Sequence, residues 1–422
     1  MDKSPTKSFE GWSWVPSLYF AEAIPYMMVN VISVIMYKNL GLNNTDIALY
    51  TSWLYLPWVI KPLWSPIIDI FKTKRQWILI TQLFIGAGLA GVALTLPVDN
   101  YFRFTLAFFW LIAFGSATHD IAADGFYMIG LSENRQAFFV GIRSTFYRVG
   151  MWFCQGLLVM FVGYLAEFEN MKFAWSVAMG IVAVMFVLFV FYHRWILPAE
   201  EHPVDENRKV INEFFKTFVS FFKKNEILLI LAFILFYRFG EGQLVKLASP
   251  FLMDSKDVGG LALDNIDLGF VYGTVGLFSL VFGGILGGVL ASRNGLKHWI
   301  WWMLIAINLP NVVYVYMSFL QPESLWIISS CVAVEQFGYG FGFTAYVLFM
   351  IYVSNGEHKT SHYAICTGLM ALGMMLPGMI SGWMQEMLGY QMFFVWVMIA
   401  TIPIFLITKY VSIDPEFGKK TS

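Results

Sequence analysis

The chain has 422 residues, of which 58% are hydrophobic and 13% are charged, and its formal net charge is −1. Soluble domains are about half apolar and about a quarter charged, so this composition leaves too little polar surface to face water. Lipid is the expected solvent for most of the chain. The nearly neutral charge argues against a nucleic-acid partner.

The apolar segments are long enough to cross a bilayer, which needs about 20 residues of helix. The polar N-terminus, MDKSPTKSFEG, leads into an apolar run too long for the core of a signal peptide, so we expect that run to be retained as the first span. Twelve spans are predicted, at 12–37, 46–70, 76–96, 102–131, 140–166, 172–195, 226–253, 265–291, 298–318, 323–353, 362–388 and 391–411.

The segment 196–225 is the only long charged stretch between spans. It predicts a division into a six-helix bundle over 1–195, a cytoplasmic linker over 196–225 and a second six-helix bundle over 226–422. Lys and Arg gather in the loops on one side, and the opposite loops hold only Lys38, Arg103, Lys172 and Lys256. The positive-inside rule then predicts that both termini and the linker are cytoplasmic.

The two halves resemble each other weakly. FGSATHDIAADGFYMIGLSENR, from Phe114, aligns with FGYGFGFTAYVLFMIYVSNGEH, from Phe337. A parallel repeat of six spans with a cytoplasmic linker is the major facilitator plan. The predicted fold class is therefore an all-α membrane protein with twelve transmembrane helices in two pseudo-symmetric bundles.

Ionisable side chains inside spans cost several kcal/mol unless they are paired or hydrated, so they are candidates for function. At roughly 1.5 Å per residue, Glu22, Lys61, Asp120 and Arg148 all lie about 13–16 Å from the cytoplasmic end, near the middle of the bilayer. The remaining charged or titratable candidates within spans are Asp69, His119, Asp124, Arg143, Arg238, Glu241, Lys246 and Glu335.

Some of these groups have a plain structural interpretation. Asp69, Arg135 and Arg143 lie near the cytoplasmic rim and are assigned, with Lys72 and Arg75 of the basic loop, to a cytoplasmic gate. Arg238 and Glu241 are three residues apart, which fits a structural ion pair as well as a binding site.

The alignment of the halves places apolar or aromatic residues opposite the charges of the first half. Asp120, Asp124 and Arg148 fall opposite Phe343, Val347 and Ala371. This asymmetry predicts that the first half handles protons and anionic groups, and that the second supplies a wall that includes Tyr339 and Tyr346.

Signatures of other chemistry are absent from the sequence. There is no P-loop, so ATP is not expected to drive transport, and no G-x-S-x-G elbow, H-E-x-x-H zinc motif or paired C-x-x-C. The cysteines, which fit no metal motif, are Cys154, Cys331 and Cys366. We expect no enzyme activity, no metal and no cofactor.

Three blocks of the first half resemble the AmpG-type muropeptide permeases, and the related acetyl-coenzyme A transporters, of the major facilitator superfamily. They are YFAEAIPYMMVN in the first span, WVIKPLWSPIIDIFKTKRQW at the end of the second, and FGSATHDIAADGFYMIGL followed by STFYRVGM. The matched positions are Lys61, Trp64, Pro66, Asp69, Asp120, Asp124 and Arg148. His119 stands where the family usually has Gln, and Gly125 stands where it has Ala, which leaves the identity of the substrate open.

The resemblance implies proton-coupled import of anhydro-muropeptides from the periplasm, through the inner membrane, by a carrier that we expect to be a monomer. Protons are assigned to Glu22, Asp120 and Asp124. The substrate is assigned to Lys61, His119, Arg148, Gln155, Trp58, Tyr147, Arg238, Glu241, Glu335, Tyr339 and Tyr346. Two alternatives stay open: a carrier of another anionic solute (an acyl-coenzyme A, a sugar or a drug), and a membrane receptor that binds without transport.

Overall fold

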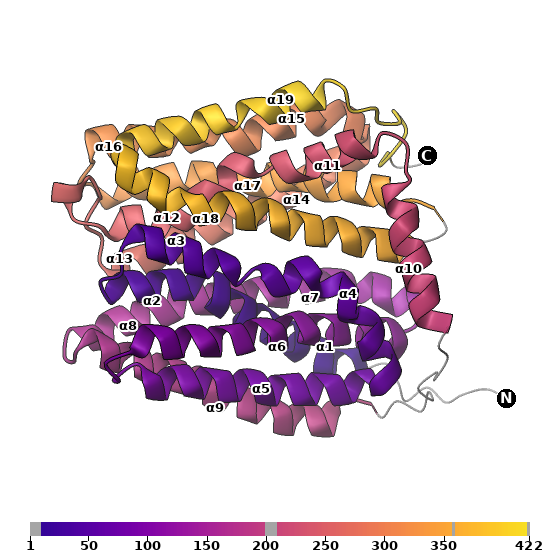
Figure 1. Cartoon of the computed structure of the whole chain (residues 1–422), viewed down its shortest axis with the longest axis horizontal. Coiled ribbons are helices and arrows are strands. Elements are labelled where there is room, and N and C mark those ends of the chain that lie inside the picture. The colour runs from indigo at the N-terminus through magenta and orange to yellow at the C-terminus, as the bar shows by residue number, and fades with distance from the viewer. Residues whose placement is uncertain (1–9, 199–208, 357–358, 420–422) are drawn as a thin grey trace. The chain divides into compact units, whose positions relative to one another are not determined.

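The computed structural model describes residues 10–198, 209–356 and 359–419, and these residues form helices and no strand (Figure 1). Ten of the helical stretches are long and apolar enough to cross a membrane. They are Gly11–Asn39, Lys74–Thr95, Tyr101–Gly130, Asn134–Ala166, Met171–Ile196, Ile227–Met253, Asn265–Asn294, Leu296–Leu320, Leu325–Ser354 and Ser361–Thr408. The prediction of an all-α membrane protein is confirmed, and the expected twelve spans are consistent with these ten stretches for two reasons.

The first reason is a break in the second predicted span. Helix α3 (Asn44–Trp53) ends before Tyr55, and α4 (Leu56–Phe71) then begins, so neither helix alone is long enough to be counted. Pro57 is the second residue of α4. The N–H groups in the first turn of a helix have no carbonyl partner within the helix, so the missing N–H of proline breaks no hydrogen bond there.

The second reason is a junction that joins the last two predicted spans. Helix α18 (Lys359–Ala400) is interrupted at Gly389, whose φ of 71° and ψ of 164° are essentially open to glycine alone. The break falls between the predicted spans 362–388 and 391–411, so one continuous stretch contains two apolar segments.

By the contacts among its residues, the chain divides into two compact units, which are described separately. The first unit comprises 1–33 and 63–208, and the second comprises 34–62 and 209–422. The segment 34–62, which holds most of α2 (Ser33–Asn39), all of α3 and the start of α4, therefore packs with the C-terminal half of the sequence.

The first unit is built on pairs of long helices: α5 packs against α6 and α9, and α1 packs against α7. Thr73 begins α5 with a capping box, in which its side chain and that of Gln76 bind each other's backbone N–H. Its helices are α1 (Glu10–Met27), η2 (Met28–Ile32), α5 (Lys74–Thr95), α6 (Tyr101–Gly130), α7 (Glu133–Trp152), η3 (Phe153–Leu158), α8 (Val159–Ala166) and α9 (Met171–Ile196).

The second unit packs α14 and α15 against α17, and α12 and α3 against α18. Close approach of α14 to α17 requires glycine, because a Cβ built on Gly283 would lie 2.2 Å from the carbonyl oxygen of Phe337. Its remaining helices are α10 (Lys209–Phe222), α11 (Ile227–Phe236), α12 (Phe239–Met253), η4 (Lys256–Val258), α13 (Asn265–Leu268), η5 (Gly269–Gly276), α14 (Leu277–Asn294), α15 (Leu296–Asn308), η6 (Leu309–Asn311), α16 (Val312–Leu320), α17 (Leu325–Ser354) and α19 (Ile402–Thr408).

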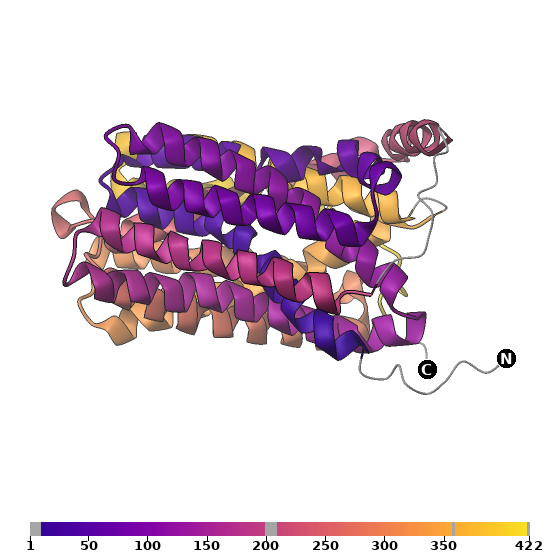
Figure 2. The same cartoon turned by 90° about the horizontal axis from the view of Figure 1, so that it is seen from below.

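The predicted linker contains a helix. In Figure 1, α10 runs across the ends of the other helices of the second unit, and Figure 2, turned by 90°, views it nearly end-on. It is tied to that unit by a contact between the Ser220 hydroxyl and Nε2 of His362, 2.9 Å apart.

Candidate functional site

A cluster of charged side chains from α1, α6 and α7 lies inside the first unit. Arg143 Nη1 is 3.2 Å from Asp124 Oδ1 and donates a hydrogen bond of 3.1 Å to the Tyr19 hydroxyl. The Tyr19 hydroxyl donates in turn to Asp124 Oδ1, at 3.0 Å. The Arg143 guanidinium also lies over the rings of Tyr19 and Tyr127, 4.7 and 5.0 Å from their centres. Arg143 was assigned to a gate, and it lies here among the carboxylates assigned to protons.

Glu22 is the most deeply buried carboxylate of this cluster. It lies one turn along α1 from Tyr19, is 8% exposed, and its Oε2 atom has no hydrogen-bond partner among the described residues. Its charge interacts with those of Asp120, Asp124 and Arg143. The three carboxylates assigned to protons are thus brought together, with one guanidinium ion-paired to Asp124.

Arg148 lies on α7, five residues beyond Arg143. It is partly buried, and within the described part of the chain its guanidinium forms no ion pair or hydrogen bond. A desolvated guanidinium without a carboxylate partner is a ready site for an anionic ligand. Tyr147 lies beside it, partly buried and within electrostatic reach of Glu22 and Asp120, and Gln155 is buried in η3.

His119 occupies a different environment from these groups. It has no exposed surface, and its Nε2 atom is 3.1 Å from Nε2 of Gln82. The same amide nitrogen is 2.9 Å from Nδ1 of His193, whose Nε2 atom is 3.0 Å from the Ser17 hydroxyl. This chain of polar side chains links α6, α5, α9 and α1, so His119 holds helices together inside the first unit.

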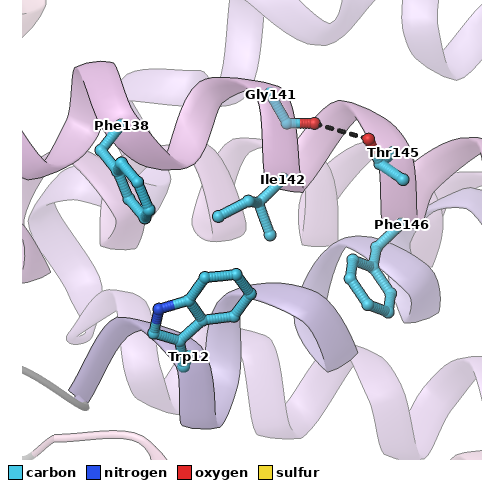
Figure 3. Close-up of a pocket in the computed structure, with 6 residues that line it drawn as sticks. All are labelled: Trp12, Phe138, Gly141, Ile142, Thr145 and Phe146. Carbon is cyan, nitrogen blue, oxygen red and sulfur yellow. Dashed lines mark hydrogen bonds between the residues drawn. The ribbon is translucent and has the colours of Figure 1, made fainter.

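A cavity of about 400 Å³ lies between the start of α1 and α7 (Figure 3). Its walls are Trp12, Phe138, Gly141, Ile142, Thr145 and Phe146. The only hydrogen bond drawn there runs from the Thr145 hydroxyl to the Gly141 carbonyl, at 2.8 Å. The cavity is apolar and contains none of the assigned site residues, and 49% of Trp12 and 61% of Phe138 are exposed, as expected of side chains that face lipid.

The second unit contains its own charged cluster at a break in a span. Helix α11 ends at Phe236, and α12 begins at Phe239 with Arg238 as its N-cap. The Arg238 guanidinium lies over the rings of Tyr339 and Phe343, 5.0 and 5.2 Å from their centres. Glu241 lies in the first turn of α12, where the helix dipole favours a carboxylate. Discontinuous spans of this kind are used as binding sites in transporters.

Glu335 of α17 lies in the same cluster. The Gln336 side-chain amide donates to both of its carboxylate oxygens, at 3.2 and 2.9 Å, and is 3.4 Å from the hydroxyl of Tyr272. The charge of Glu335 interacts with that of Glu241. The second half is therefore more highly charged at this depth than the aligned sequences suggested.

The other residues assigned to substrate in the second unit are in mixed surroundings. Tyr346 is fully buried, stacks on Tyr237 at 4.6 Å, and donates to the Ile234 carbonyl at 2.6 Å. Trp58 and Lys61 lie partly buried on α4. Lys246, on α12, donates to the Thr51 hydroxyl at 3.0 Å, and its ammonium lies 5.0 Å from the centre of the Tyr55 ring.

In the basic loop after the second span, Arg75 binds backbone carbonyl groups. Arg75 donates from Nε to the Leu197 carbonyl at 3.1 Å and from Nη2 to the Arg194 carbonyl, so it satisfies carbonyls at the end of α9. Lys72 is exposed and Arg135 is partly buried. Asp69 lies on α4, but its side chain is outside the described part of the structure.

Sequence reasoning missed a polar network that ties the segment 34–62 to α12 and α18 within the second unit. Asp254, at the end of α12, forms an ion pair of 2.6 Å with Lys38 and accepts a hydrogen bond of 2.7 Å from Tyr390. Asn44 donates to Gln385 at 2.6 Å and is 2.8 Å from the Tyr390 hydroxyl. Thr45 binds Glu386, at 3.1 Å through its N–H and at 2.7 Å through its hydroxyl. We call these contacts of Lys38, Asn44 and Thr45 the hairpin network, because all three residues belong to the helical hairpin within 34–62. These residues are polar and lie at span ends, so nothing in their hydropathy distinguishes them from ordinary loop residues.

Comparisons with known proteins agree with this architecture. A sequence profile of the Major Facilitator Superfamily matches residues 17–357. The anhydromuropeptide permease of Escherichia coli K12 is 25% identical over 351 residues, which cover 82% of this chain and 68% of the permease. A relative from Rickettsia conorii that bears the name AmpG 4 is 23% identical over 391 residues, which cover 88% of this chain and 89% of the relative.

Solved structures show the same fold. A bacterial homologue of the human lysosomal transporter Spinster superposes with a TM-score of 0.71 at 16% identity, covering 97% of this chain and 98% of that one. These matches confirm the resemblance and the major facilitator fold inferred from the sequence.

Proposed function

The chain belongs to the Major Facilitator Superfamily, and we propose that this transporter imports anhydro-muropeptides into the cytoplasm, driven by protons. It is a multi-pass membrane protein and not an enzyme. The observation that carries the choice of substrate is the similarity to the anhydromuropeptide permease of Escherichia coli over 82% of the chain.

The chemistry of the first unit supports an anionic substrate. An anhydro-muropeptide joins an amino sugar to a short acidic peptide, so it presents carboxylates, hydroxyls and amides. Arg148 offers a partly buried guanidinium with no carboxylate partner in the described structure, and it can bind a carboxylate in bidentate fashion. Tyr147 and Gln155 offer hydroxyl and amide groups to the sugar and peptide.

Coupling to protons rests on the carboxylates of the same unit. Asp124 is ion-paired with Arg143, and the charge of Glu22 interacts with those of Arg143, Asp120 and Asp124. A substrate carboxylate that attracts Arg143 away from Asp124 would leave these carboxylates less well compensated and favour proton uptake. Release of the substrate would restore the Arg143–Asp124 pair and expel the proton.

The direction of transport follows from the proposed orientation. Both termini are taken as cytoplasmic, in the inner membrane, because the basic residues gather in the loops on that side. The hairpin network then lies at the periplasmic ends of its spans, and the two units would rock to expose the site to each side in turn.

The test is uptake of labelled anhydro-muropeptide into proteoliposomes, with and without an inward proton gradient. We expect accumulation only with the gradient, and uptake indifferent to it would refute coupling. Coenzyme A esters and free amino sugars, added as competitors, test the substrate class, since stronger competition from either would overturn the muropeptide assignment. Saturable binding with no flux would identify a receptor instead.

The variant Asp124→Asn distinguishes proton coupling from substrate binding and exchange. It should lose gradient-driven accumulation yet retain exchange of substrate across the membrane, because the site would remain but one proton acceptor would not. Asp99→Asn is the matched control, since Asp99 is exposed between spans. Full accumulation by Asp124→Asn would remove Asp124 from the coupling site.

A further inference from the structure

We propose that Glu241 and Glu335 together bind one proton, so that one of the two is protonated and the other is ionised, which makes a proton-binding site within the second unit. The site would be separate from the carboxylates of the first unit and does not depend on the identity of the transported substrate. It also gives these two side chains a role different from contact with the substrate.

Burial is the first observation that supports the site. Glu241 is 1% exposed and Glu335 is 2% exposed. Glu241 lies roughly 18 to 21 Å of helix from either end of its span, near the middle of the bilayer. An ionised carboxylate at this depth is costly unless it is compensated.

Missing compensation is the second observation. Within the described residues, neither carboxylate oxygen of Glu241 has a hydrogen-bond partner. A buried acceptor without a donor costs about 1–3 kcal/mol, and protonation removes the charge that makes burial of this carboxylate costly. Glu335 is the neighbouring carboxylate, close enough for the two charges to repel each other.

The positive charges near the pair do not balance it. Arg238 is the cation that interacts with Glu241, and it lies against the rings of Tyr339 and Phe343. Lys246, the other cation of α12, is engaged by Thr51 and the Tyr55 ring. Two carboxylates facing one guanidinium leave one negative charge, which a single proton neutralises.

The other described groups that interact with the pair are neutral. Tyr272 and Tyr314, from η5 and α16, interact with both carboxylates, and the Gln336 amide binds Glu335. Cys331 of α17 is within reach of Tyr314.

Of the elements packed against α12, α3, α11 and α13 contain no Lys, Arg or His. Where α18 approaches Gly240 and Gly242, its contacting residues are Gly373, Met374, Pro377, Val397 and Thr401, none of which titrates. Asp267, on α13, interacts with Asp264 rather than with the pair.

The burial of the two carboxylates favours a proton as the ligand. A side chain with almost no exposed surface cannot meet a sugar or a peptide, whereas a proton needs only a path of hydroxyl and amide groups. The described residues also contain no group of three or more His, Cys, Asp or Glu side chains that could hold a metal ion.

The test uses the purified full-length protein without substrate, in sodium-free buffer at pH 7, and infrared spectroscopy. The carbonyl stretch of a protonated carboxylic acid is recorded for the wild type, Glu241→Gln and Glu335→Gln. We expect each variant to lose the intensity of the same single carboxylic acid, because the carboxylate that remains can ionise beside Arg238. Glu323→Gln is the control. Glu323 lies outside the spans, and the hydrogen bond from Lys256 holds its pKa below the usual range, so this variant should lose nothing.

Two results would overturn the proposal. One is unchanged intensity in both variants, and the other is intensity that disappears from the wild type when sodium is added, which would mean that the pair binds a metal cation. If either variant fails to fold, Gln336→Leu removes the amide bound to Glu335 and leaves both carboxyl groups in place. The frequency of the band should then shift, and an unshifted band would contradict the proposal. Because no substrate is present, failure here is distinct from failure of the transport assay.

Discussion

Arg148 lies partly buried within a span of the first unit, and its guanidinium has no hydrogen bond or ion pair among the described residues. Arg143 is occupied by Asp124 and Tyr19, and Arg75 by the carbonyls at the end of α9, whereas Arg148 has no partner in the described structure. Removal of Arg148 should therefore weaken binding of an anionic substrate without disturbing the packing of the unit.

For Arg148→Gln we expect the KM for an anionic substrate to rise about 10- to 100-fold, because a charge-assisted hydrogen bond is worth about 1.5–3 kcal/mol. Arg148→Lys should recover only part of this loss, since an ammonium cannot bind a carboxylate in bidentate fashion. Initial rates of uptake across substrate concentrations measure both values. Arg103→Gln, at an exposed position, is the control. An unchanged KM in Arg148→Gln would exclude this residue as a ligand.

At this scale, sequence alone identified which residues are unusual but not how they pair. A charge inside an apolar run stands out without a structure, and Glu22, Asp124, Arg148 and Glu241 were all found that way. Their partners depend on the rotation and depth of other helices. The contact of Arg143 with Asp124 was therefore not foreseen. Nor was the network of His119, in which Gln82 lies 37 residues before His119 and 111 residues before His193.

Among the helices, glycine decides which pairs can pack most closely. Gly283 of α14 faces the backbone of α17, whereas nothing lies within 4 Å of the Cβ position of Gly288 on the same helix. This difference gives a test of helix packing that does not involve any charged group.

Gly283→Ala should lower the melting temperature of the purified protein, because its Cβ would lie 2.2 Å from the Phe337 carbonyl oxygen, and overpacking of this kind costs about 1–3 kcal/mol. Gly288→Ala should leave the melting temperature unchanged or raise it. Equal melting temperatures for the two variants would show that α14 and α17 are not in close contact in the membrane.

The existence of the elements was more predictable than their interruptions. Hydropathy located the spans because every residue that faces lipid must be apolar. The breaks at Tyr55 and Tyr237 were not foreseen. The residues next to Tyr55 are apolar, and the charged residues that follow Tyr237, Arg238 and Glu241, were interpreted as groups within one continuous span. The break at Gly389 was predicted as the boundary between the spans 362–388 and 391–411.

At the scale of the whole molecule, the two compact units do not coincide with the N-terminal and C-terminal halves of the sequence. The segment 34–62 precedes four spans of the first unit yet belongs to the second. The hairpin network fastens it there, and Asp254 is the residue on which Lys38 and Tyr390 converge.

Asp254→Ala should therefore loosen this segment. Loss of the ion pair and the hydrogen bond costs about 1–3 kcal/mol, equivalent to roughly 5- to 150-fold faster amide exchange where exchange requires opening of the network. Hydrogen exchange of peptides from 34–62, followed by mass spectrometry, measures the change. The control is Lys256→Gln, which breaks the exposed ion pair with Glu323 and should have little effect. Equal exchange in both variants would mean that the network does not hold the segment.

The membership of 34–62 in the second unit also bears on attempts to cut the protein in two. Separation of the gene at the charged linker would yield a C-terminal fragment without its own hairpin. Gln385 and Glu386 would lose Asn44 and Thr45 as hydrogen-bond donors at the ends of their spans, and the buried Lys246 would lose the Thr51 hydroxyl. We therefore expect such a fragment to fold in the membrane only when the N-terminal fragment is co-expressed with it.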